Sequence, residues 1–151
     1  MSDPSPGVLR APADLKRAHA RMLALCHMLE DIADGLPARV DPFRCLAVAA
    51  NLVPVLQQCH RFEEEIVFPA FASLQDADRI VARLKLEHLE DDCAAADLSE
   101  LLLAHGHGRP IDNPEALGYM LRALFEPMRR HIAFERDHIL PGILGRHQAL
   151  G

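Results

Sequence analysis

The sequence predicts an all-α protein built as an up-down-up-down antiparallel four-helix bundle. Half of its 151 residues are hydrophobic, only 5% are aromatic and tryptophan is absent, a composition that favours helices over strands. Apolar residues recur at steps of three and four, and clusters of proline and glycine divide the chain into four long segments. Four helices joined by short loops pack as antiparallel neighbours.

The clusters of proline and glycine set the expected boundaries. Two clear breaks lie at residues 34–42 and 106–114, and a weaker one lies at residues 73–76. The four helices are therefore expected at about residues 13–34, 42–72, 76–105 and 114–144. We expect a single bundle domain over residues 13–146, preceded by a flexible N-terminal segment at residues 1–12.

The first two segments carry clear helical signals. Apolar residues of the first lie on one helical face: Leu15, Met22, Leu25, Leu29 and Ile32. The second begins at Asp41-Pro42, where a capping side chain precedes a proline at the first helical position. Pro54 inside this helix removes one backbone hydrogen bond and is expected to kink it.

The last two segments repeat these signals. Ile80, Leu84 and His88 follow helical spacing, with Asp91 on the opposite face. Asn113-Pro114 repeats the combination of a capping residue and a proline. Residues 15–19 (LKRAH) also resemble residues 84–88 (LKLEH), so the two halves of the chain look like versions of one helix pair.

Net charge and cysteine pattern narrow the expected partners and location. A formal charge of -6 repels nucleic-acid phosphates and anionic lipids, so neither nucleic acid nor membrane is an expected partner. The longest apolar run, residues 45–56, is too short to cross a bilayer. The four cysteines form no C-x-x-C pair and are expected to be small buried hydrophobes in a cytoplasmic protein. Cys59 stands out because it precedes a candidate ligand.

Candidate chemistry lies in two pairs of side chains. Residues four apart share a helix face, so His60 with Glu64, and His131 with Glu135, each offer an imidazole and a carboxylate to one point. One such pair alone is weak support for a metal site, because His and Glu also form solvated pairs on helices. The presence of a second pair with the same spacing strengthens the case for a metal site.

Two further histidines are predicted to lie at the same height in the bundle. In an antiparallel pair, residues at one level are equally far from the connecting loop. The midpoints between His19 and His60, between Glu64 and His88, and between His88 and His131 all fall in or beside predicted loops. His27 fits this test less well than His19.

The predicted metal ligands therefore form one layer of the bundle: His19, His60, Glu64, His88, His131 and Glu135. Buried without partners, these groups would each be destabilising by several kcal/mol. Neutral imidazole and carboxylate suit iron, manganese and zinc, and the set is large enough for two metals bridged by carboxylates. Glu63 and Glu65 are expected at the surface or as groups that orient an imidazole.

These residues resemble the hemerythrin-like, HHE cation-binding domains. The most specific parts are HRFEEEIVFP at residues 60–69 and HIAFERDHILP at residues 131–141, and the resemblance covers nearly the whole chain. It implies a four-helix bundle with two iron ions, bridged by Glu64 and Glu135 and by an oxo or hydroxo group. Asp92 and Arg136 depart from the oxygen-carrying hemerythrins at two ligand positions, and this argues against simple reversible oxygen carriage.

The resemblance implies a module that binds or senses O2, NO or peroxide, more as a binding protein than as an enzyme. One alternative is a ferritin-type di-iron oxidase or peroxidase, which uses E-x-x-H on two helices, whereas only Glu135 with His138 matches here. Others are a protein that stores, delivers or repairs iron centres, and a helical interaction module without metal. An unidentified protein partner is compatible with each of them.

Overall fold

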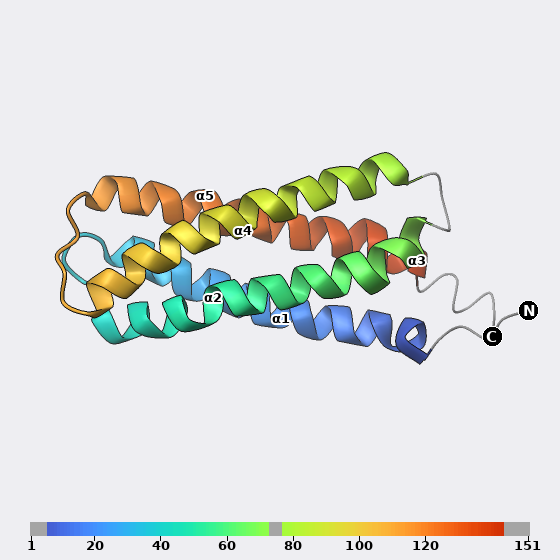
Figure 1. Ribbon diagram of the computed structural model, residues 1–151, viewed down its shortest axis with the longest axis horizontal. Helices are drawn as coiled ribbons and strands as arrows, with labels where there is room; N and C mark the ends of the chain where they lie inside the picture. The colour runs from blue at the N-terminus through green and yellow to red at the C-terminus, as the bar shows by residue number, and fades with distance from the viewer. Residues whose placement is uncertain (1–5, 73–76, 144–151) are drawn as a thin grey trace, which may run out of the picture.

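The computed structural model describes residues 6–72 and 77–143, with side chains from residue 12 onward. Four long helices lie along one axis in antiparallel order and form the predicted bundle (Figure 1). They are α1 (Pro6–Gly35), α2 (Pro42–Phe62), α4 (Asp78–Gly106) and α5 (Pro114–Phe134). The loops from α1 to α2 and from α4 to α5 lie at the same end of the bundle. The predicted fold class is confirmed.

Boundaries agree with the sequence pattern at most helix ends. The side chains of Asp41 and Asn113 cap α2 and α5, accepting hydrogen bonds from the backbone N–H groups of Phe43 and Ala116. Helix α1 begins at Pro6, earlier than the predicted start near residue 13. The weak break at residues 73–76, the first five residues and the predicted end of the domain at 144–146 lie outside the described residues.

Both α2 and α5 continue into a π-helical turn, which the sequence pattern did not predict. These turns are η1 (Glu63–Val67) and η2 (Glu135–Ile139), and η1 leads into the short helix α3 (Phe68–Ala72). In each turn the backbone bond spans five residues: the N–H of Phe68 donates to the Glu63 carbonyl, and that of Leu140 to the Glu135 carbonyl.

A proline follows each π-helical turn. Pro69 and Pro141 lack a backbone N–H, and the proline ring crowds the carbonyl four residues earlier in an α-helix. A wider turn just before the proline relieves that crowding. π-Turns of this kind are often found at functional sites.

The core consists of two apolar clusters with a polar layer between them. The larger cluster fills the bundle toward the loop end and includes Leu29, Leu52, Leu98 and Leu124, all fully buried. A smaller cluster at the opposite end of the bundle includes Leu15, Val67, Phe68, Leu84 and Ile139. Buried His and Glu side chains occupy the layer between the two clusters.

A helix that crosses a membrane must be both long and apolar, and the four main helices of this chain are long. Within residues 6–72 and 77–143, none of them combines the length with the apolar character needed to cross a membrane.

Candidate metal centre

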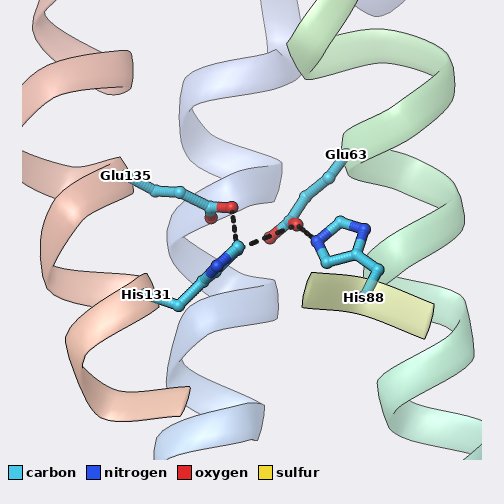
Figure 2. Close-up of side chains that lie close together, drawn as sticks. All are labelled: Glu63, His88, His131 and Glu135. Atoms are coloured by element: carbon cyan, nitrogen blue, oxygen red, sulfur yellow. Dashed lines mark hydrogen bonds and ion pairs between the residues drawn. The ribbon is translucent and has the colours of Figure 1, made fainter. Parts of the chain in front are cut away.

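Two buried carboxylates form the middle of the polar layer. Glu63 begins η1, Glu135 begins η2, and their exposed fractions are 1% and 0%. Figure 2 shows both side chains extending from their own helices toward the bundle axis. Two carboxylates cannot remain charged inside an apolar core without partners, so the groups around them decide whether this layer is stable.

Two imidazoles contact one oxygen of each carboxylate (Figure 2). His88 Nε2 lies 2.7 Å from Glu63 Oε2, and His131 Nε2 lies 2.6 Å from Glu135 Oε1 and 3.7 Å from Glu63 Oε2. The four side chains offer ligand atoms that lie within 4.8 Å of one another. We call this set the first lobe, and its donor atoms are those of a metal site.

A third imidazole contacts the remaining carboxylate oxygens. His19 Nε2 lies 2.5 Å from Glu135 Oε2 and 3.7 Å from Glu63 Oε1. We call these atoms the second lobe. Each carboxylate therefore has one oxygen in the first lobe and one in the second, which is the arrangement that a bridging carboxylate requires.

One contact tests directly whether these residues fit a metal. His88 Nε2 and Glu63 Oε2 are 2.7 Å apart and fully buried, yet within the described part of the chain neither atom makes a hydrogen bond of acceptable geometry. Buried polar atoms normally have hydrogen-bond partners. Two such atoms that converge without one are placed as ligands of a shared ion would be, so the donor set fits a metal.

Outer carboxylates orient two of the imidazoles. The Nδ1–H of His88 donates to Glu64 Oε1 at 3.1 Å, and that of His131 donates to Glu87 Oε2 at 3.2 Å. Metal-binding histidines commonly donate the second ring N–H to a carboxylate in this way. The Nε2 atom of each ring is thereby directed toward the first lobe.

Electrostatics of the metal-free cluster follow from these contacts. Burial alone would lower the pKa of His131, but its hydrogen bond to Glu135 and the nearby charge of Glu63 outweigh this effect and raise the pKa to about 11. For His19 the same balance raises the pKa to about 9. Burial likewise favours a neutral Glu63, yet its three imidazole partners hold its pKa well below the usual range. Protons on the imidazoles thus compensate the charge of Glu63, whereas burial and that charge raise the pKa of Glu135.

His60 and Glu64 lie beside this cluster and not in it. His60 is buried, donates from Nδ1 to Asp92 Oδ1 at 3.0 Å, and stacks on the His88 ring with centroids 3.7 Å apart. Burial and the neighbouring charge of His88 lower the pKa of His60 to about 3. The Glu64 side chain is 38% exposed and contacts Nδ1 of His88 from outside the cluster.

The structure therefore brings together four of the predicted ligands, and it exchanges the expected roles of two neighbouring glutamates. His19, His88, His131 and Glu135 converge, together with Glu63, which was expected at the surface or in an orienting role. Glu64 has the orienting role instead. The cause is the rotation of α2, because successive residues of a helix point about 100° apart.

Two signals in the sequence could have identified Glu63. The buried stripe of α2 runs through Leu52, Leu56 and Cys59, and its next step of four residues is Glu63. Glu63 also stands six residues before Pro69, as Glu135 stands six before Pro141. The prediction instead aligned the two halves on their histidines, so it placed Glu64 and not Glu63 in the layer.

Comparison with known proteins gives a family. The family model described as the hemerythrin HHE cation binding domain matches residues 11–143. No match was found among curated proteins or among solved structures. The matched range covers all four long helices and every residue of the buried His and Glu cluster. The chain belongs to the hemerythrin HHE cation-binding domain family.

Proposed function

We propose that the polar layer holds two iron ions, one in each lobe, and that the pair binds O2, NO or peroxide. The observation that carries this proposal is the division of the carboxylate oxygens. In both Glu63 and Glu135, one oxygen contacts an imidazole of the first lobe and the other faces His19 of the second. Two metals bridged by two carboxylates would use all four oxygens.

Iron is the metal proposed because of the donor set. Nitrogen and oxygen ligands suit iron, and also zinc or manganese, while geometry and availability decide between these metals in the cell. Bound iron would supply an ion that changes oxidation state and accepts a small ligand. The buried carboxylates and imidazoles would hold the ions, and the two apolar clusters on either side would limit the access of water to the layer.

A cavity gives a small ligand a route to the first lobe. It has a volume of about 430 Å³ and lies between α4 and α5, lined by Leu84, Glu87, His131 and Phe134 among others. His131 is 9% exposed, so its ring separates this cavity from the carboxylates. Apolar and charged side chains both line the cavity, Arg83 and Arg130 among the charged ones, so a small ligand that enters it would reach His131 first.

Contacts of His138 weigh against a ferritin-type oxidase. That class needs a Glu-x-x-His pair on each of two helices, all projecting inward. His138 is exposed and packs on the Phe134 ring with centroids 4.8 Å apart, so it does not point at the cluster. We therefore propose ligand binding or sensing over oxidase or peroxidase chemistry.

Metal analysis tests the proposal most directly. The full chain is purified without added metal, and iron, zinc and manganese are measured together with absorption spectra in air and after reduction. Two irons per chain, with near-ultraviolet bands that change on reduction and on addition of NO, are the expected result. A chain that stays metal-free after incubation with ferrous iron under argon would overturn it.

A further inference from the structure

Corresponding landmarks of helices α2 and α5 are separated by one constant spacing. The capping residues Asp41 and Asn113, the buried Glu63 and Glu135, and the prolines Pro69 and Pro141 are each 72 positions apart. The same spacing relates η1 to η2, which begin at residues 63 and 135. The two helices are therefore equivalent from their N-caps to their π-helical turns, without an insertion in either.

At this spacing the counterpart of His131 is Cys59. Each of them precedes the buried glutamate of its own helix by four residues, and each contacts that glutamate. His131 Nε2 lies 2.6 Å from Glu135 Oε1, and the thiol of Cys59 donates to Glu63 Oε1 at 3.4 Å. His60, which resembles His131 in its local sequence, corresponds instead to the apolar Ile132.

The thiol contacts the oxygen that belongs to the second lobe. Glu63 Oε1 lies 3.4 Å from the Cys59 sulfur and 3.7 Å from His19 Nε2, so α1 and α2 each supply one donor beside it. The first lobe likewise has one donor side chain from each of the other two helices, His88 on α4 and His131 on α5. Without Cys59, the second lobe would have one helix donor fewer than the first.

The other buried cysteines lack this setting. Cys26 and Cys45 are fully buried within the larger apolar cluster, where a thiol is only a small hydrophobe. Cys59 instead lies at the boundary of that cluster, 4% exposed, next to a surface cavity of about 620 Å³ between α1 and α2. Cys59 itself lines this cavity, so a proton released from its thiol has a route to solvent.

We propose that Cys59 is a thiolate ligand of the metal in the second lobe. The inference rests on the proposed metal pair and concerns the makeup of one half of it. On binding, the S–H bond of Cys59 breaks, a sulfur–metal bond forms and the proton leaves to solvent, with no change in oxidation state. A thiolate makes this lobe softer than the first and favours iron, cobalt or zinc over manganese.

Cobalt(II) reports sulfur ligation directly in the full chain. The metal-free protein is titrated with Co(II) under argon, and absorption is recorded in the visible range and in the near ultraviolet, where thiolate-to-cobalt charge transfer absorbs. The variants are Cys59→Ser, Cys59→His and, as a matched control, Cys93→Ser, which changes an exposed cysteine of α4. Circular dichroism confirms that each variant keeps its helices.

The expected result is a charge-transfer band in the parent and in Cys93→Ser, and its loss in Cys59→Ser. Cys59→His should keep the visible cobalt bands and two bound metals while losing the near-ultraviolet band. Visible bands without charge transfer in the parent, or an unchanged band in Cys59→Ser, would overturn thiolate ligation and leave the metal pair intact. Absence of any cobalt band would overturn both proposals.

Discussion

Glu63 and Glu64 are adjacent in the chain but face different parts of the bundle. Glu63 is 1% exposed between the two lobes, whereas Glu64 only orients His88 from outside. We expect Glu63→Gln to lower the number of metals bound at saturation. Glu64→Gln should keep that number and weaken affinity by about 10–100-fold, as loss of an orienting carboxylate does. Titration with Co(II) or ferrous iron measures both quantities.

The reverse result at this pair would have a specific meaning. Loss of bound metal in Glu64→Gln, with full binding in Glu63→Gln, would show that α2 turns by one residue when metal binds. His60 and Glu64 would then be ligands, as the local sequence pattern predicted.

The imidazoles of the layer predict how the metal-free protein responds to pH. Folding raises the pKa of His131 to about 11 and that of His19 to about 9, both above the usual 6.5. Above pH 6.5 the unfolded chain therefore binds fewer protons than the folded one, and the free energy of unfolding should fall as pH rises toward 9. Folding lowers the pKa of His60 to about 3, which favours unfolding as pH drops below 6.5, whereas burial raises the pKa of Asp91 to about 6 and acts in the opposite direction below that pH.

Urea denaturation in the presence of a chelator measures this dependence. A free energy of unfolding that falls between pH 6.5 and 9 is expected. A free energy that rises steadily between pH 6.5 and 9 would contradict the ion pairs of His19 and His131 with Glu135.

At the scale of helices, the N-caps give a prediction with an internal control. The Asn113 side chain accepts a hydrogen bond from the Ala116 N–H at 3.0 Å, so Asn113→Ala should lower the free energy of unfolding by about 1 kcal/mol. Asn51→Ala makes the same chemical change in the middle of α2. Asn51 donates only to the exposed Ala47 carbonyl, which water can replace, and alanine is the better helix former.

Chemical denaturation of both variants distinguishes the loss of the N-cap hydrogen bond from the general effect of replacing asparagine by alanine. Asn51→Ala should be neutral or slightly stabilising. Equal losses of stability in the two variants would contradict a specific role for the cap.

The sequence predicts the helices and the level of each residue along the bundle axis. It does not predict how each helix is rotated about its own axis. Heights depend on distances from the loops, and proline with a capping residue marks those loops clearly; His19 and His88 were placed correctly in this way. Rotation changes by about 100° for each residue, so a shift of one position exchanges Glu63 with Glu64. The π-helical turns add to this difficulty, because they depend on local strain near Pro69 and Pro141 and leave little mark on the apolar pattern.

For the whole molecule, metal and folding are expected to be coupled. The polar layer draws donors from all four long helices, and they converge only in the folded chain. A ligand that binds only the folded state stabilises it by about 2.7 kcal/mol when its free concentration is 100 times its dissociation constant. Thermal unfolding should therefore shift upward with added iron under argon and downward with a chelator.

The Glu63→Gln variant serves as the control for this coupling. Its transition should respond much less to iron than that of the parent. An iron-induced shift of equal size in both proteins would place the stabilising site outside the polar layer.

The constant spacing between α2 and α5 also bears on ancestry. A single hairpin with the pattern of residues 77–143 would carry Glu135 on an apolar face that nothing covers, so it could fold only by associating with a second copy. Two identical copies would meet about a two-fold axis between their glutamates and supply four imidazoles in equivalent pairs. Fusion of two such copies into one chain would leave each half free to diverge, and Cys59 opposite His131 is a position where the two halves differ beside the buried glutamates.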